Sequence, residues 1–321
     1  MRIKKYGNNL NQRRVERSFL KNITLFSLMI LISACQGNTQ KSNKLNVVTT
    51  TNIFTDLVHN IGGDSIQLQG LMGAGVDPHL YKASEGDVTK LSQSDIIFYG
   101  GLHLEGKMVD VFEKMKSINK MTVPLGESIP KEQLIESANF GGNYDPHTWF
   151  NALLLKHMAN KVTAVLSKSD PKNSDYFKAN NIKYQKELDE LDTYIRAKLE
   201  SLPKEKRILV TAHDAFNYFG KEYGVQVLGL QGISTATEAG VKDVQRLRDF
   251  IIKNQIKAIF IESSVPRRNI EALQKAVEKD GYSVKIGGSL YSDALGSQTS
   301  TEGTYIGMFK YNVNTIVESL K

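Results

Sequence analysis

Cysteine is almost missing from this chain of 321 residues, since Cys35 is the only one. An exported chain with a lone thiol either leaves that thiol reactive or uses it. Long apolar runs are also missing at the N-terminus, where the segment Ile23 to Ile32 is shorter than the ~20 residues that a membrane-spanning helix needs. This segment is therefore expected to be something other than a permanent membrane span.

Several common catalytic motifs are missing as well. The sequence has no Gly-rich phosphate loop, no G-x-S-x-G elbow and no H-E-x-x-H pair. Gly73-Ala74-Gly75 lacks the further glycine and the following helix of a dinucleotide-binding fingerprint, so we interpret it as a turn. We therefore find no motif that predicts an enzyme.

A surplus of basic charge is missing from the part of the chain that would fold. The formal net charge is +7 and the sequence pI about 9.1, but residues 1–34 hold seven Lys/Arg and one Glu. Without them the chain is nearly neutral. We see no basic stripe interleaved with aromatic residues, and so expect no nucleic-acid partner.

The N-terminus has the order of a lipoprotein signal. A basic region leads into the apolar segment Ile23 to Ile32, followed by Ile32-Ser33-Ala34-Cys35, which resembles the bacterial lipobox. We expect residues 1–34 to be a signal peptide and Cys35 to be lipidated. Residues 35–44 would be a polar tether that reaches from the membrane. The alternative is a free cysteine after an uncleaved apolar segment.

Short β-branched runs alternate with helix-length segments in two similar halves. This alternation predicts parallel strands connected by helices, and therefore the α/β class with a core in each half. In the first half the segments are Leu45–Thr51, Ile53–Ile61, Ile66–Leu71 and Ile96–Tyr99. In the second half they are Arg207–Thr211, Val225–Leu230, Val241–Asn254, Ala258–Ile261, Arg268–Lys279 and Val284–Ile286.

A long helix is predicted between the halves. Residues 170–202 open with Asp170-Pro171, keep apolar residues at a helical period and contain no helix breaker. A helix of this length suits a rigid strut between two lobes. The apolar stripe is too short for a coiled-coil dimer, and we expect a monomer.

Two copies of one tripeptide are the strongest candidates for a binding site. Proline restricts the backbone on both sides, so Asp77-Pro78-His79 and Asp145-Pro146-His147 each present a histidine on a stiff corner. The alternative is ordinary Asp-Pro turn chemistry followed by a chance histidine.

Two further candidates are His213, directly after a predicted strand, and Asp293, in the loop after another. Because ligands of open α/β sheets bind outside the carboxyl ends of strands, two imidazoles from one lobe could meet an imidazole and a carboxylate from the other. Such an N₃O set suits a divalent transition metal, with zinc favoured and manganese still open.

Several longer stretches show a resemblance that covers essentially the whole chain after the signal segment. The sequence resembles the TroA-like family of zinc- and manganese-binding solute-binding lipoproteins of bacterial ABC importers. The matching stretches are Val76–Tyr81, Gly101–Glu105, Tyr144–Trp149, Thr211–Phe216 with Tyr218-Phe219, Gly232–Thr235 and Tyr291–Leu295.

The resemblance implies two Rossmann-like lobes, each a parallel sheet flanked by helices, joined by one long rigid helix. It implies an N-terminal lobe at 45–169, a linking helix at 170–202 and a C-terminal lobe at 203–321. A metal would be bound between the lobes, and the ligands implied are His79, His147, His213 and Asp293.

The resemblance also implies an extracytoplasmic protein, lipid-anchored through Cys35, that hands its metal to a membrane permease. Manganese-specific relatives tend to carry a glutamate where this chain has His213, so we expect Zn²⁺, with Mn²⁺ as the alternative.

His103 is expected to be structural or to support a ligand, and Glu262 could hydrogen-bond near the site. We expect His59 and His157 to be ordinary surface or core residues.

Two other functions compete with transport. Three histidines and a carboxylate could activate water in a zinc hydrolase, but catalysis needs an open coordination position that four protein ligands would fill. A surface adhesin is the second rival. Deep burial of the four side chains would favour transport, whereas an exposed patch would favour adhesion.

Overall fold

The computed structural model describes residues 44–321, except 138 and 139. The predicted signal peptide at 1–34, the lipidation site Cys35 and the tether up to residue 43 lie outside the described residues. No helix in the described part is long and apolar enough to span a membrane.

The N-terminal part of the described chain forms a four-stranded parallel sheet in the order β2-β1-β3-β4. The central strand β3 is apolar and buried throughout, and its neighbour β1 is buried from Val47 to Thr49, as expected for a parallel sheet covered on both faces. The strands are β1 (Leu45–Thr49), β2 (Ile66–Gly70), β3 (Ile96–Tyr99) and β4 (Met121–Pro124); the helices of this part are α2 (Asn52–Gly62), α3 (Glu85–Gln93), α4 (Val109–Ser117) and α5 (Ala152–Ser169).

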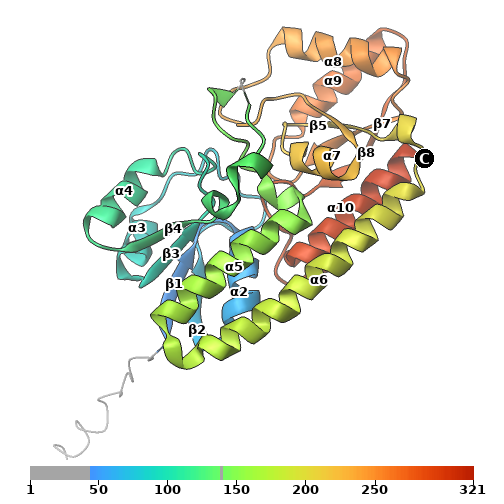
Figure 1. The fold of residues 1–321 in the computed structure, drawn as a ribbon. Helices are drawn as coiled ribbons and strands as arrows, with labels where there is room; N and C mark the ends of the chain where they lie inside the picture. Colours follow the sequence, from blue (N-terminus) through green and yellow to red (C-terminus); the bar gives the residue numbers. More distant parts are fainter. Residues whose placement is uncertain (1–43, 138–139) are drawn as a thin grey trace, which may run out of the picture. The chain divides into compact units, whose positions relative to one another are not determined.

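The C-terminal part contains two parallel strand pairs, β5 with β6 and β7 with β8, and β5 lies next to β7. Helices flank these strands, so this part repeats the α/β pattern of the first (Figure 1). The strands are β5 (Ile208–Thr211), β6 (Gln226–Gly229), β7 (Ala258–Glu262) and β8 (Lys285–Leu290); the helices are α7 (Asn217–Tyr223), α8 (Val241–Lys253), α9 (Arg268–Lys279) and α10 (Tyr305–Leu320).

One long helix, α6 (Ser174–Glu200), connects the two lobes. Its 27 residues span about 40 Å at 1.5 Å per residue. Figure 1 shows α6 running beside α5 of the N-terminal lobe and α10 of the C-terminal lobe, and α6 packs on both. Its buried stripe is Phe177, Tyr184, Leu188, Leu191, Ile195 and Leu199, at the spacing that predicted the helix.

The main hydrophobic core runs through both lobes. It joins Phe54 and Trp149 of the first lobe to Leu188 of α6 and to Phe219 and Phe309 of the second. The expectation of a separate core in each half is therefore wrong for this cluster. Two smaller clusters do stay within one lobe, around Leu91 in the first and Leu247 in the second.

Candidate metal site

Both Asp-Pro-His tripeptides fold into the same backbone corner. The Asp77 Oδ1 atom accepts a hydrogen bond from the backbone N–H of His79 at 2.8 Å, and Asp145 Oδ1 accepts one from His147 at 2.9 Å. The first corner lies between β2 and α3. The second lies just before α5, whose first turn is capped by the side chain of Asn151.

The other two candidates follow strands of the C-terminal lobe. His213 lies two residues after β5 and Asp293 three residues after β8, so both are at carboxyl ends of parallel strands. The backbone near Asp293 is held by the indole N–H of Trp149, which donates to the carbonyl oxygen of Ser292 at 3.0 Å.

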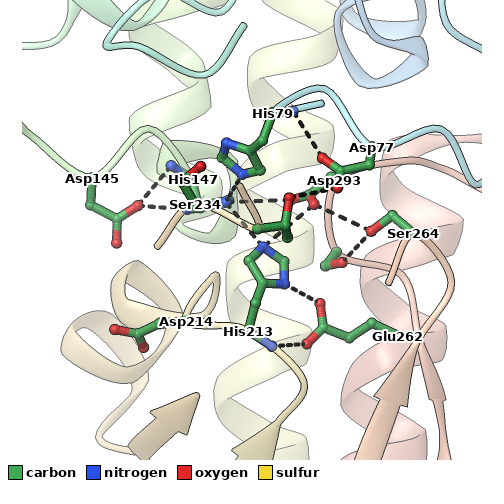
Figure 2. Close-up of polar contacts among 12 residues, drawn as sticks. Asp77, His79, Asp145, His147, His213, Asp214, Ser234, Glu262, Ser264 and Asp293 are labelled. Carbon is green, nitrogen blue, oxygen red and sulfur yellow. Dashed lines mark hydrogen bonds and ion pairs between the residues drawn. The ribbon is translucent and has the colours of Figure 1, made fainter. Parts of the chain in front are cut away.

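The four candidate side chains point toward one another (Figure 2). The Nε2 atom of His147 lies 3.2 Å from that of His79 and 3.4 Å from that of His213. Asp293 places Oδ1 3.4 Å from His147 Nε2 and Oδ2 3.4 Å from His213 Nε2. A tetrahedral ion with metal–ligand distances of about 2.0–2.1 Å separates its donor atoms by about 3.3 Å. The donor spacing therefore fits a small divalent ion.

Burial and missing partners also indicate a cation. The four side chains belong to residues that are between 0% and 3% exposed. Among the described residues, the buried atoms Asp293 Oδ1 and His79 Nδ1 have no hydrogen-bond partner. A buried carboxylate oxygen without a donor is costly, and a metal ion at the centre of the four would satisfy it.

Carboxylates contact two of the three imidazoles at Nδ1, the ring nitrogen that does not face the centre of the site. Asp145 Oδ1 lies 2.7 Å from His147 Nδ1, and Glu262 Oε2 lies 2.6 Å from His213 Nδ1. With Nδ1–H donating to the carboxylate, each Nε2 lone pair faces the centre, as in carboxylate–histidine–zinc triads. The hydrogen bond expected for Glu262 is therefore present, and it links Glu262 directly to His213.

The same carboxylates control the charge of the metal-free site. Burial alone would lower the pKa of His147, but Asp145 and Asp293 outweigh it and raise that pKa to about 9. Burial likewise opposes protonation of His213, yet Glu262 and Asp293 raise its pKa well above the ordinary value. Burial would raise the pKa of Asp293, but His213 and His147 lower it well below its usual range.

His79 has a different environment. Burial lowers its pKa to about 3, against the opposing charge of Asp293. Its imidazole is therefore neutral near pH 7 and ready to donate a lone pair without losing a proton.

The remaining histidines lie elsewhere. His103 is exposed on the loop after β3, with φ of 64°, and among the described residues no hydrogen bond joins it to the four candidates. Of the two roles expected for His103, structural or supporting a ligand, the second is therefore not found. His59 is exposed on α2 and His157 half-buried on α5, in line with an ordinary role for both.

Sequence reasoning missed three polar contacts of the site. Ser264 Oγ lies 3.2 Å from Asp293 Oδ2, Asn217 Nδ2 donates to Asp145 Oδ2 at 3.1 Å, and Thr235 donates to Asp77. Only the stretch around Thr235 carried a signal, because it belongs to a motif of the resemblance.

Comparison with known proteins gives the same picture. Residues 47–319 match the family described as zinc-uptake complex component A, periplasmic. The chain belongs to this family. Manganese-binding lipoprotein MntA of Bacillus subtilis is 44% identical over 307 residues, covering 95% of this chain and 100% of MntA. Zinc-binding protein TroA of Treponema pallidum is 48% identical over 276 residues, covering 85% of this chain and 88% of TroA.

The fold agrees with a solved relative. The structure of the periplasmic zinc-binding protein TroA from Treponema pallidum matches with a TM-score of 0.84 at 47% identity. The match covers 87% of this chain and 99% of that chain. Two α/β lobes joined by a long helix are therefore confirmed as the architecture.

Proposed function

We propose that this protein captures a divalent transition metal between its lobes and delivers it, chemically unchanged, to the membrane permease of an ABC importer. The ligands are His79, His147, His213 and Asp293. The observation that carries the proposal is that these four buried donors converge at the spacing of a tetrahedral ion. Membership of the zinc-uptake family supports the transport role.

Zinc is the proposed cargo. Three imidazole nitrogens and one carboxylate oxygen suit zinc better than a hard, oxygen-preferring ion. The zinc-binding protein TroA, 48% identical, supports the same choice.

Manganese is the alternative cargo. Asp293 turns one oxygen toward His147 and the other toward His213, so it can offer two oxygens and raise the coordination number above four. Manganese tolerates such oxygen-rich sites, and MntA, 44% identical, is named for manganese binding.

We also propose that the protein works outside the cytoplasm as a lipid-anchored monomer. Residues 1–34 would be its signal peptide, Cys35 the lipidated residue and 35–44 the tether. The folded part would divide into lobes at 45–169 and 203–321 with the linking helix at 170–202. The lipoprotein names of relatives such as MntA support this arrangement.

A binding role is favoured over the rival functions. A hydrolase needs a coordination position for water, which four converging protein ligands would occupy. An adhesin needs an exposed recognition surface, and burial of the four ligands gives none at this site. We therefore propose that the protein is not an enzyme and that adhesion is not its main role.

Metal analysis tests the proposal directly. Protein purified without chelator should contain about one transition-metal ion per chain, and zinc should win a competition with manganese. His79→Ala should remove the metal, whereas the matched control His103→Ala, on an exposed loop, should retain it. Metal-free wild-type protein that takes up neither ion would contradict the proposed function.

The anchor has its own test. Cys35→Ser should release the protein from membranes of a bacterial host with lipoprotein processing. Mass spectrometry that finds an unmodified N-terminus upstream of Cys35 in such a host would refute the anchor and leave the metal site unaffected.

A further inference from the structure

The two Asp-Pro-His tripeptides use their aspartates differently. Asp145 accepts one hydrogen bond from the backbone N–H of His147 and another from the ring of His147. Asp77 also accepts a hydrogen bond from the backbone N–H of the histidine that follows it, His79. The ring of His79, however, has no hydrogen-bond partner at Nδ1 among the described residues. The second oxygen of Asp77 instead accepts a hydrogen bond from the hydroxyl of Thr235 at 2.6 Å.

This hydrogen bond connects two irregular segments from different lobes. Residues 73–80, which carry His79, contain no helix or strand, and neither do residues 230–240, which carry Thr235. Within the described chain, only two hydrogen bonds join 73–80 to another segment: the one between the rings of His79 and His147, and the one from Thr235 to Asp77. Thr235 itself is 7% exposed, so water competes little for its hydroxyl.

The other three ligands are held more firmly. His147 is fixed by Asp145 and leads into the capped helix α5, and His213 is held by Glu262 through both ring and backbone. Asp293 contacts Ser264, while its neighbour Ser292 accepts from Trp149. Because all four ligands are almost fully buried, an ion can pass only if some segment moves. The segment with the fewest hydrogen bonds to other segments is the one that carries His79.

We propose that Thr235 is a positioning residue that ties residues 230–240 to the Asp77 corner and thereby slows the exit of bound metal. The inference rests on the proposed function, since it concerns the same metal. It assigns a role to the Gly232–Thr235 motif, which supplies none of the four ligands.

The expected effect is on the rate of dissociation. Thr235 is not one of the four ligands, and in the described part of the chain its hydroxyl donates its hydrogen bond to Asp77 and to none of the four ligand side chains. Its loss should leave coordination geometry unchanged while freeing the His79 segment to open more often. A hydrogen bond to a carboxylate corresponds to about a 10- to 100-fold change in an equilibrium constant, so metal should leave about 10-fold faster or more.

Thr235→Val tests this, because it removes the hydroxyl and nearly keeps the shape. Thr235→Ser restores the hydroxyl and should restore slow release. Thr237→Val is the matched control, since Thr237 is exposed on the same segment. Zinc release into excess chelator would be followed by stopped flow, and the absorption spectrum of Co²⁺-loaded protein would report coordination geometry.

Faster release from Thr235→Val, with an unchanged Co²⁺ spectrum and with wild-type rates in Thr235→Ser and Thr237→Val, would support the proposal. Wild-type release from a folded Thr235→Val protein would overturn it, as would an altered Co²⁺ spectrum. If that variant fails to fold, Thr235→Ala takes its place with the same outcomes. Failure of the wild type to bind Zn²⁺ or Co²⁺ would instead refute the proposed function.

Discussion

Glu262 holds His213 at two points: Oε1 accepts from the backbone N–H at 2.8 Å and Oε2 lies 2.6 Å from ring Nδ1. Both oxygens of this buried carboxylate therefore accept hydrogen bonds from the same residue. The arrangement fixes the direction of Nε2 and also determines what can replace the histidine.

His213→Glu should shift preference from zinc toward manganese, because an anionic oxygen replaces a neutral nitrogen. The new carboxylate would lie close to Glu262, and two buried like charges disfavour each other. We therefore expect the clearest shift in His213→Glu combined with Glu262→Gln. Titration calorimetry with both metals measures it, with Glu262→Gln alone as the control; an unchanged zinc preference in the double variant would refute the selectivity argument.

Replacing both His79 and His147 by alanine should weaken zinc binding by more than about 100-fold, since losing even an outer partner of a ligand costs 10- to 100-fold. The fold should persist, because the main core lies in other residues. Calorimetry measures affinity, and circular dichroism checks the fold. Wild-type affinity in a folded double variant would show that the ligands are misassigned.

Zinc affinity should rise with pH from the acidic range up to about 9. The raised pKa values of His147 and His213 mean that the metal-free site binds protons at neutral pH, and zinc must displace them. Titrations in buffers of different ionisation enthalpy should show proton release on binding, and acid should release the metal. A heat of binding that does not depend on the buffer at pH 7 would contradict this expectation.

Asp56→Asn should stabilise the protein at pH 7. Burial, against a hydrogen bond from the backbone of Tyr305, raises the pKa of Asp56 from 3.8 to about 6. Below pH 3.8 Asp56 is neutral in both the folded and the unfolded chain, and the stability of the folded state is fully present. As pH rises through about 6, ionisation of the buried carboxyl lowers the free energy of unfolding by about 3 kcal/mol. Asparagine keeps an acceptor for Tyr305 without the charge. Urea unfolding at pH 7 and pH 4 should show a gain at pH 7 that shrinks at pH 4, and an equal effect at both would argue against charge as the cause.

The two lobes should move little on metal binding. Helix α6 packs on α5 of one lobe and α10 of the other, which resists a hinge more than a few strands would. Small-angle scattering of metal-free and metal-loaded protein should give nearly equal radii of gyration. A large decrease on loading would mean that α6 bends or unwinds.

Strongly patterned elements could be predicted from the sequence. The continuous apolar run Ile96–Tyr99 and the helical period of Arg268–Lys279 predict elements at the observed bounds, because apolar patterning is a direct signal of burial. Strand β4 was not predicted, since only Val123 of its four residues is buried and Pro124 lies within it. No prediction covers helix α10 either, although its buried residues Met308, Phe309, Val313, Ile316 and Val317 recur at a helical period, so the signal was present in the sequence.

The candidate ligands could be found from local motifs and the resemblance, but their supporting contacts could not. Ser264 lies 29 residues from Asp293, and Thr235 lies 158 residues from Asp77. Serine and threonine are common and carry no distinctive spacing, so only the three-dimensional structure shows which hydroxyls meet the site. The Gly232–Thr235 motif was visible in the sequence, but its partner was not.

The core that joins the lobes through α6 limits how the protein could be divided. A cut within α6 would leave its two parts packed on α5 and α10, but it would separate aromatic pairs that cross between the lobes, such as Phe150 with Phe216 and with Phe309. Each separate fragment would expose these buried rings, and exposed apolar patches favour aggregation. Two fragments produced together could cover these rings and bring the four candidate ligands together again, so we expect the lobes to be engineered as a pair.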